Sequence, residues 1–560
     1  MNKKISLSLL LTSVLLLTSC SGKFAPTSDY FNVTPQVLVL QGGKVPATID
    51  GTFPAKSFPA KAIVTITPVL KYDGGEALGT PLTLQGSKVK ANNKVIGKEG
   101  GSFSLSTVYD YIPAMSKSEL YLRFTTKLGK KSIAIPDIKV ADGVIATEAL
   151  ADAASATPAI AADKFQRVIQ EAHEASILFL IEQAKIRENQ LKMAPVQDLN
   201  SKIAETGKDT SKQISSIELS SYASPDGPLT LNEKLAGSRE KATIGYLKNT
   251  LKKAKATGAI DAKFTAEDWE GFQQLVSASN IQDKELILRV LSMYSDPEKR
   301  ETEIKNLSSV YKNLAEEILP QLRRSKMKLT VDIIGKSDDQ LKNFAQNDPS
   351  KLNVDEMLYT ATLPGTDKEA IYKKTAELFP NDYRAYNNLG VLAFKAGNIS
   401  TAKSYFEKAS QLNNSAEVNS NLALVAMTTG ADAATVNAYL GKAAGSEGLK
   451  EAQGIAYIKQ GEYTKAVQSF GDLKTNNAAL AQLLAKDYSK AKATLDAVPQ
   501  PNAETNYLKA LVGARTNNKD LVVSGLKAAV SANKAYAKKA LNDVEFSKYV
   551  LDASVASILK

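Results

Sequence analysis

Residues 221–247 read Ser-Tyr-Ala-Ser-Pro-Asp-Gly-Pro-Leu-Thr-Leu-Asn-Glu-Lys-Leu-Ala-Gly-Ser-Arg-Glu-Lys-Ala-Thr-Ile-Gly-Tyr-Leu, and this stretch indicates how the middle of the chain folds. An alternating run, 214–219, comes just before it, and its apolar residues two apart predict a strand with one apolar face. Pro, Asp and Gly at 225–227 then break the strand. From 231 to 253 apolar residues recur at helical spacing. The stretch therefore predicts a strand, a turn and a helix.

Two polar side chains of the predicted helix are placed to act together. Asn232 and Arg239 lie on either side of Leu235 at i, i+3 and i+7, so the amide and the guanidinium share one face beside the turn. A guanidinium offers a planar fork of donors that matches a carboxylate. The pair is therefore a candidate carboxylate-binding site.

The stretch resembles the OmpA-like peptidoglycan-binding domain, whose signature is a strand, Gly-His-Thr-Asp, a short loop, and then Asn-x-x-Leu-Ser-x-x-Arg-Ala-x-x-Val-x-x-x-Leu. The residues in register with the helix of that signature are Asn232, Leu235, Arg239, Thr243 and Leu247, with Thr243 standing where Val is usual. Residues 221–224 stand against Gly-His-Thr-Asp, so Ser224 replaces the acidic residue of the family.

In that family the Asp and the Arg jointly hold the amine and the carboxylate of the diamino acid in the peptidoglycan stem. The resemblance therefore implies a peptidoglycan-binding site with Arg239 and Asn232 on the carboxylate side. Ser224 stands at the position of the missing acid, and Asp226 is a second candidate two residues further on. Another interpretation stays open, in which Arg239 only holds a loop in a domain retained for its fold.

The N-terminal residues read as a secretory signal with a lipid attachment site. A basic start is followed by an apolar run over 5–17 and by Leu-Thr-Ser-Cys at 17–20. The run is too short to span a membrane and ends in small residues. This ending resembles a lipobox, which implies removal of residues 1–19 and acylation, palmitate included, of Cys20, the single cysteine. No acidic residue directly follows Cys20, so we expect a lipid anchor in the outer membrane, on its periplasmic face.

The composition of the 560-residue chain bounds its architecture and its chemistry. This length predicts about three or four domains, and 43% hydrophobic and 23% charged residues are typical of globular proteins. The formal charge of +11 is spread along the chain, which favours an anionic cell wall or lipid over nucleic acid. With one Cys and one His, the sequence offers no zinc cluster, disulfide or thiol–imidazole pair. We therefore expect a protein that is not an enzyme and has no cofactor or metal.

Two segments precede the stretch quoted above. Residues 20–147 contain short strand-like runs between Gly-containing turns, which predict a β-sandwich of immunoglobulin-like type. The strand-like runs include 37–40, 62–69, 103–108, 120–124 and 132–140. Residues 148–163 are rich in alanine and are expected to form a linker.

Residues 164–345 are predicted to form the α+β OmpA-like domain. Its expected elements are a strand at 176–181, a helix at 191–206, the strand at 214–219, the helix at 231–253 and a last strand at 327–334. Residues 263–322 carry helical apolar stripes and separate the last strand from the rest. We therefore expect 263–322 to be a helical insertion.

Residues 350–560 show the spacing of the tetratricopeptide repeat (TPR), a repeat of paired helices. The matching positions are Tyr386, Leu389, Gly390, Ala402, Phe406 and Ala409, and again Gly454, Tyr457, Gly461, Ala466 and Phe470. Small residues at Gly390 and Ala402 let paired helices approach closely. Roughly five such units are expected to stack into an all-α solenoid, whose concave side is the usual binding surface for a protein partner.

Two functions fit this multidomain organisation. In the first, the protein is a lipid-anchored scaffold or tether that contacts peptidoglycan through the OmpA-like domain and a protein partner through the TPR repeats. In the alternative, it is an accessory lipoprotein of an envelope assembly or secretion complex, and its OmpA-like domain no longer binds peptidoglycan. Ser224 in place of the family acid keeps the alternative open.

Overall fold

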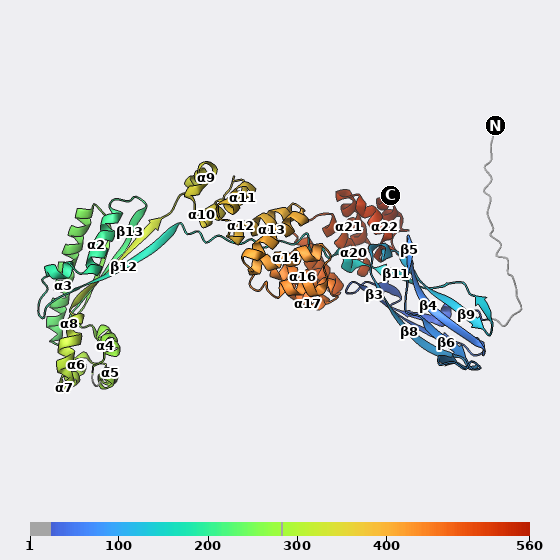
Figure 1. Cartoon of the computed structure of the whole chain (residues 1–560), viewed down its shortest axis with the longest axis horizontal. Coiled ribbons are helices and arrows are strands. Elements are labelled where there is room, and N and C mark those ends of the chain that lie inside the picture. The colour runs from blue at the N-terminus through green and yellow to red at the C-terminus, as the bar shows by residue number, and fades with distance from the viewer. Residues whose placement is uncertain (1–23, 282–283) are drawn as a thin grey trace. The chain divides into compact units, whose positions relative to one another are not determined.

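The computed structural model describes residues 24–281 and 284–560 (Figure 1). The predicted signal peptide, 1–19, and the predicted lipidation site, Cys20, lie outside the described residues. The chain divides into two compact units. The first comprises the described part of Met1–Ala162 together with Tyr372–Lys560, and the second is Asp163–Ile371.

The first unit begins with two β-sheets that share one core. The strand order is β1-β3-β8 in the smaller sheet and β2-β11-β9-β4-β6-β7 in the larger, where β10 also pairs with β9 and β5 with β4. The bounds are β1 (Phe31–Thr34), β2 (Val37–Val39), β3 (Lys44–Phe53), β4 (Ala62–Tyr72), β5 (Gly75–Leu78), β6 (Leu82–Gly86), β7 (Lys94–Ile96), β8 (Gly101–Asp110), β9 (Ser118–Leu128), β10 (Lys131–Ala134) and β11 (Ile138–Ile145). Short 3-10 turns are η1 (Ser28–Tyr30), η2 (Pro113–Ser116) and η3 (Thr147–Leu150).

Alternating apolar residues explain these strands. In β8, Phe103, Leu105 and Tyr109 are buried, whereas the polar residues between them are exposed. Aromatic rings fill much of the shared core, with the ring centroids of Phe53 and Phe58 5.2 Å apart. The prediction of an N-terminal β region is confirmed.

The second unit is built on a four-stranded sheet in the order β12-β15-β13-β14. Strand β15 is antiparallel to β12 and β13, and β14 is parallel to β13. The bounds are β12 (Val168–Leu178), α1 (Glu188–Leu191), α2 (Ala194–Thr206), β13 (Lys212–Tyr222), α3 (Leu229–Ala254), β14 (Ile260–Thr265) and β15 (Arg324–Ile334). Helices α2 and α3 pack on the sheet through Val196, Leu199 and Leu247. The mixed α/β prediction for this region is confirmed.

Two strands of this sheet differ from the expectation. Strand β12 begins at Val168 instead of 176, and His173 lies within it. Residues 260–265 form β14, although the sequence analysis began a helical insertion at 263. The reason is that Ile260, Ala262 and Phe264 alternate with polar residues and pair in parallel with the end of β13.

A helical insertion separates β14 from β15. Its elements are α4 (Trp269–Ala278), α5 (Lys284–Met293), α6 (Pro297–Asn306), α7 (Ser308–Asn313), the π-helical turn η4 (Leu314–Ile318) and α8 (Leu319–Leu322). The insertion has its own core, which includes Phe272, Ile287 and Leu314. After β15 the chain continues through α9 (Asp338–Asn347), η5 (Pro349–Lys351), α10 (Val354–Thr360) and α11 (Lys368–Leu378).

The rest of the first unit is an all-α region of paired helices. The pairs are α12 (Tyr383–Lys395) with α13 (Ile399–Leu412), α14 (Ala416–Thr428) with α15 (Ala433–Leu440), α16 (Leu449–Lys459) with α17 (Tyr463–Phe470), α18 (Asn476–Leu484) with α19 (Tyr488–Asp496), and α20 (Ala503–Arg515) with α21 (Lys519–Ala532). We call these pairs the helical array. It is followed by α22 (Ala535–Asn542), η6 (Val544–Phe546) and α23 (Ala553–Leu559).

Two local features recur along the array. A residue with positive φ follows the first helix of each pair, namely Gly397, Gly430, Gly461, Lys486 and Asn517. Within pairs, a Cβ atom on Gly390 would lie 2.6 Å from the ring of Phe406, and one on Gly454 would lie 2.5 Å from the ring of Phe470. The predicted all-α repeat region and the close packing at Gly390 are therefore confirmed.

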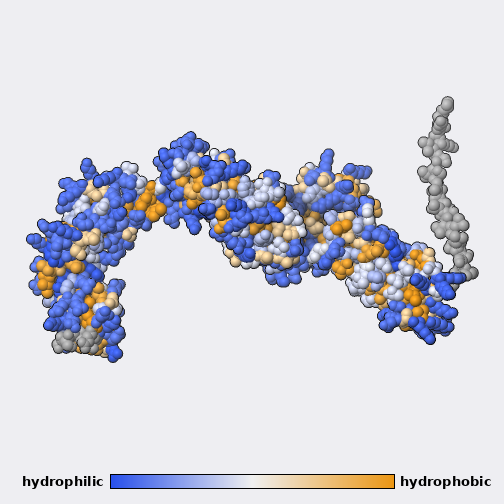
Figure 2. All heavy atoms as spheres, viewed as in Figure 1, coloured by the Kyte–Doolittle hydropathy of each residue, from blue (hydrophilic) through white to orange (hydrophobic). Residues whose placement is uncertain are grey.

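The surface of the chain is mostly hydrophilic. Figure 2 shows hydrophilic residues over most of the visible face, with hydrophobic residues in scattered patches. Among the helices of the described residues, none is both long and apolar enough to cross a membrane.

Candidate functional site

Residues 151–161, which we call the strap, lie along the helical array. The strap follows η3 and has no helix or strand of its own. Its backbone is held by side chains from α12, α14, α16 and α18, the first helices of four successive pairs. We call the side of the array formed by these helices the strap-binding face. The alanine-rich segment predicted as a linker is thus bound to the array along most of its length.

Three asparagines hold the strap by the same bidentate contact. Asn388 accepts a hydrogen bond from the N–H of Ala161 (2.9 Å) and donates one to its carbonyl (3.0 Å). Asn421 does the same to Ala159, at 2.7 and 2.8 Å. Asn477 completes the series with Asp152, at 3.0 and 2.8 Å. A primary amide carries one acceptor and two donors, so each asparagine pairs with a strap residue much as a neighbouring β-strand would.

Further polar groups link these contacts into a network. Asn387 donates to the carbonyl of Ala159 (3.0 Å), and its own carbonyl accepts from Asn421 (2.9 Å). The carboxylate of Glu451 accepts from the N–H of Thr157 (3.0 Å). Burial of Glu451 raises its pKa, and the bond from Thr157 opposes that shift. Apart from a bond from Asn477 to the hydroxyl of Ser155 (3.1 Å), the contacts to the strap are made with its backbone.

The side chains of the strap that face the array are small. Ala156, Ala159 and Ala161 are 5%, 4% and 1% exposed, whereas Ile160, which points away, is 42% exposed. The array is also shaped for close approach, because a Cβ atom on Gly448 would lie 3.2 Å from the carbonyl oxygen of Thr157. A larger residue at the buried positions would therefore collide with the array.

The residues just before the strap join the array to the β region. The carboxylate of Glu148, which is 3% exposed, accepts from the N–H groups of Gly42 and Gly43 at 2.8 and 2.9 Å. It also accepts from the hydroxyl of Tyr463 on α17, at 2.6 Å. Nearby, the hydroxyl of Thr147 donates to Glu545 at 2.6 Å. The strap therefore begins at a fixed point.

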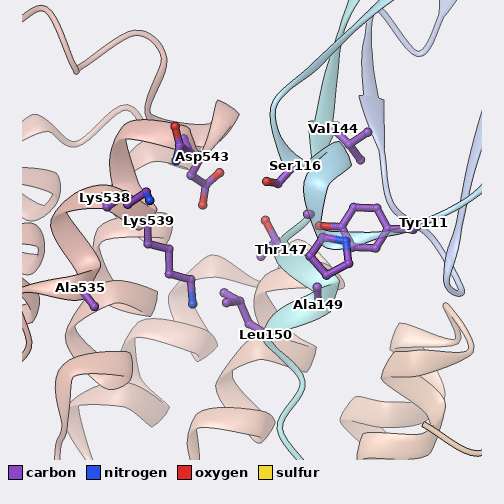
Figure 3. Close-up of a pocket in the computed structure, with 13 residues that line it drawn as sticks. Tyr111, Ser116, Val144, Thr147, Ala149, Leu150, Ala535, Lys538, Lys539 and Asp543 are labelled. Carbon is purple, nitrogen blue, oxygen red and sulfur yellow. The ribbon is translucent and has the colours of Figure 1, made fainter. Parts of the chain in front are cut away.

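A cavity of about 470 Å³ lies beside this junction (Figure 3). Lys538, Lys539 and Asp543 face it from the C-terminal helices, opposite Tyr111 and Thr147 (Figure 3). Asp543 already accepts a hydrogen bond from the buried hydroxyl of Tyr507 at 2.6 Å, and burial raises the pKa of Asp543. The carboxylate is therefore part of the junction between the β region and the array.

Arg239, the residue at the centre of the predicted peptidoglycan site, lies in the second unit and is 1% exposed. Its guanidinium donates to three backbone carbonyls, those of Gln183 (3.0 Å), Tyr222 (2.8 Å) and Leu180 (3.3 Å). It also lies 5.3 Å from the ring centre of Phe179. Burial lowers the pKa of Arg239 to about 10, with a further contribution from the positive charge of Arg323.

The other three predicted site residues lie around the turn that follows β13. Ser224 donates to Asp226, and Arg323 donates to both, with its Nε 3.1 Å from the Ser224 hydroxyl and an Nη 2.9 Å from the Asp226 carboxylate. Asn232 donates to the carbonyl of Gly227 at 2.9 Å. The structure thus brings Ser224 and Asp226 together through Arg323, while Asn232 fixes the turn.

The helical insertion packs against the same turn. Pro225 lines a cavity with Trp269, Phe272, Tyr311 and Leu314, and the volume of this cavity is only about 10 Å³. That is about the space that one water molecule requires. A diamino acid does not fit between the turn and the insertion in this conformation.

The sequence analysis did not identify the asparagines or Arg323. A signal for the asparagines was present, since Asn388, Asn421 and Asn477 each stand two residues before the small residue at which paired helices approach, in Asn-Leu-Gly, Asn-Leu-Ala and Asn-Ala-Ala. Aligning the repeats on that small residue would have shown the recurrence. No comparable signal marked Arg323, which the fold brings to Asp226 from the far side of the insertion.

The chain shows only distant similarity to known proteins. No protein-family model matches the chain, and no curated protein matches it. Among solved structures it is similar to a tetratricopeptide repeat protein from Parabacteroides merdae, with 15% identity, 40% of this chain and 91% of that chain covered, and a TM-score of 0.28. It is also similar to yeast Tom70, with 10% identity, 66% of this chain and 86% of that chain covered, and a TM-score of 0.25. The description of the array as a helical repeat rests on its own paired helices.

Proposed function

We propose that this protein is a non-enzymatic, lipid-anchored scaffold on the periplasmic face of the outer membrane, an accessory of an envelope assembly or secretion complex. The single observation that carries the proposal is that the helical array already binds a polypeptide, the strap, through its backbone. A surface of this kind suits protein recognition. The lipid anchor is proposed from Cys20 and its surrounding sequence.

The contacts of Arg239 argue against peptidoglycan binding by the second unit. Its guanidinium is fully buried and already serves three carbonyls. The carboxylate of Asp226 is paired with Arg323, and these side chains are only 14% and 10% exposed. A bound diamino acid would have to break these bonds and leave buried polar groups without partners, which is costly.

Peptidoglycan binding is the second candidate function, and one observation favours it. Asp226 lies close enough to Arg239 for its charge to raise the pKa of that guanidinium, and it contacts Arg323 directly. A carboxylate beside guanidinium groups is the combination that an amine and a carboxylate of one ligand require. Opening of the turn would be needed to expose this combination.

Sedimentation with purified peptidoglycan sacculi distinguishes the two functions. We expect the purified full chain to stay in the supernatant at about 0.15 M salt. If it sediments there, we expect roughly 1 M salt to release it from the sacculi, because the Debye length falls from about 8 Å to about 3 Å. The salt step matters because a net charge of +11 can hold the protein on an anionic wall without a site.

Two variants complete the experiment. Asp226→Ala removes the carboxylate that pairs with Arg323, and Ser224→Asp restores the family acid. Neither should change sedimentation. Salt-resistant sedimentation that Asp226→Ala abolishes in a folded protein, or that Ser224→Asp strengthens, would overturn the proposal in favour of a peptidoglycan tether.

A further inference from the structure

We infer that the strap is a tethered competitor for the strap-binding face, and that the face takes an extended segment of a partner protein with small residues at the positions of Ala156, Ala159 and Ala161. This inference deepens the proposed function by naming the class of partner segment. The occupant is one kind of segment, a peptide that is extended over the positions equivalent to 157–161 and carries alanine, serine or glycine at the positions of Ala156, Ala159 and Ala161.

The first step is that recognition is directed at the backbone. Asn388, Asn421 and Asn477 contact N–H and carbonyl groups that every residue except proline possesses. The one side-chain contact of these asparagines is the bond from Asn477 to the Ser155 hydroxyl, and the contacts of Asn388 and Asn421 would fit any extended segment. The face therefore selects its ligand by conformation and by the size of the inward side chains.

The second step is that the inward positions admit only small side chains. Ala159 is 4% exposed. The array approaches the strap closely here, because a Cβ atom added to Gly448 would lie 3.2 Å from the carbonyl oxygen of Thr157. Ile160 shows the opposite behaviour, because its side chain is 42% exposed. A partner segment is thus constrained at the positions of the buried strap residues and unconstrained at exposed ones such as that of Ile160.

The third step is that the strap does not satisfy the whole face. The hydroxyl of Ser420 on α14 is buried and has no hydrogen-bond partner among the described residues. It lies in the face itself, since a Cβ atom on Gly448 would be within 3.3 Å of it and within 3.2 Å of the Thr157 carbonyl oxygen. A buried hydroxyl without a partner is unfavourable, and a segment with serine near this point would pair with it. The strap is therefore an imperfect ligand.

The strap nevertheless occupies the face because it is tethered. A segment linked to its site has an effective concentration in the millimolar range, so a free peptide of equal intrinsic affinity binds only when that competitor is removed. The strap's inward side chains are methyl groups or proline, which bury little apolar area, so its affinity for the face rests mainly on the hydrogen bonds to its backbone. Competition from the strap would set a threshold that only a well-matched or multivalent partner exceeds.

The test uses a fluorescent peptide with the sequence of residues 149–163 and measures its binding to the purified full chain by anisotropy. In the opened variant, Ala159→Lys with Ala161→Lys, the strap cannot enter the face. The matched control is Ile160→Lys, which adds charge at an exposed position and keeps the strap in place. We expect the opened variant to bind the peptide at least about tenfold more tightly than the wild type and the control.

Two further arms assign this binding to the face. Adding Asn388→Ala and Asn421→Ala to the opened variant should abolish it, and a peptide with lysine at the positions of Ala159 and Ala161 should not bind. Equal affinity of the opened variant and the Ile160→Lys control would overturn the inference, as would equal binding of the lysine peptide. These outcomes concern the array alone, whereas the sacculi experiment concerns the second unit, so the two failures are distinguishable.

Hydrogen exchange of the wild-type chain keeps the inference testable if the opened variant does not fold. A tethered competitor opens locally, so the amides of Ala159 and Ala161 should exchange many-fold faster than those in the middle of α14 and α16. Exchange of the strap amides as slow as that of these helices would show a permanent structural element and would overturn the inference.

Discussion

At the scale of single residues, the guanidinium of Arg239 joins two backbone segments that are distant in the sequence. Its acceptors belong to the loop after β12 and to the end of β13. The carbonyl of Leu180 also accepts from the N–H of Gln183 at 3.2 Å, and the burial of Arg239 keeps water away from its guanidinium. Arg239 is therefore a stabilising residue of the second unit in this conformation.

This role predicts the effect of Arg239→Ala. The substitution removes the guanidinium from three carbonyls, of which that of Leu180 keeps the N–H of Gln183, and should reduce the free energy of unfolding by roughly 2 kcal/mol or more. Chemical denaturation of the full chain, followed by signals from the second unit, would measure the loss. The role would be refuted if the unfolding midpoint were unchanged while binding to a ligand was lost.

Glu451 provides a pH-dependent prediction. Burial raises its pKa above the ordinary value of 4.5, so the folded state binds the proton more tightly than the unfolded state. The stability that Glu451 contributes is therefore complete below about pH 4.5 and is lost as the pH rises through the raised pKa. Glu451→Gln keeps an acceptor for the Thr157 N–H without the buried charge.

We therefore expect Glu451→Gln to raise the melting temperature at about pH 7 and to change it little near pH 4. Thermal unfolding of both proteins across this pH range gives the measurement. A destabilised variant at neutral pH would mean that the charge of Glu451 strengthens its bond to the strap by more than burial costs.

At the scale of elements, the helix pairs of the array depend on small residues at fixed positions. Gly390→Ala would place a methyl group 2.6 Å from the ring of Phe406. Larger changes, such as Gly390→Leu or Ala402→Leu, overpack the pair further and should cost about 1 to 3 kcal/mol. Limited proteolysis should then release a stable N-terminal β region while the array is degraded.

Gly245 in the middle of α3 is the matched control. A Cβ atom there meets no atom within 4 Å, so Gly245→Ala should be neutral or stabilising by up to about 1 kcal/mol. Wild-type resistance of residues 350–560 to protease in Gly390→Leu would contradict the packing described for α12 and α13.

The sequence predicted elements best where one periodicity continued. The alternation in β8 and the helical spacing from Tyr386 to Phe406 are local patterns, and both correspond to observed elements. Strand β14 was not predicted, and its second half was assigned to the helical insertion, because the strand is short and lies between helical segments. This segment is a strand because it pairs with β13, and such pairing cannot be recognised from the local sequence.

The two candidate sites were harder to predict, for different reasons. Alanine-rich composition is typical of linkers, and the strap is ordered by polar side chains of helices distant in the sequence, the asparagines and Glu451. For Arg239 and Asn232, the sequence placed both residues on one helix, but their hydrogen-bond partners come from segments that only the tertiary fold brings near. Residue identity and spacing therefore indicated a polar cluster without showing which groups it would satisfy.

At the scale of the whole molecule, the proposed membrane attachment depends on Cys20, which lies outside the described residues. Cys20→Ala should leave an unlipidated precursor, because acylation requires the thiol. Two or more acyl chains give stable anchoring, whereas one is marginal. We expect the variant to leave the outer-membrane fraction on carbonate extraction, and its retention there would contradict lipid anchoring.

The central claim is that the segment between the β region and the second unit is an ordered ligand of the array and not a free linker. Its most direct test is the rate of maleimide labelling of single cysteines introduced at 159, 160 and 161 in a Cys20→Ser background. The described structure predicts that Ile160→Cys, at a position 42% exposed, reacts at least about tenfold faster than Ala159→Cys and Ala161→Cys, at positions 4% and 1% exposed. Adding Asn421→Ala should accelerate labelling at 159. Equally fast labelling at all three positions would show that the segment is free and would contradict the claim.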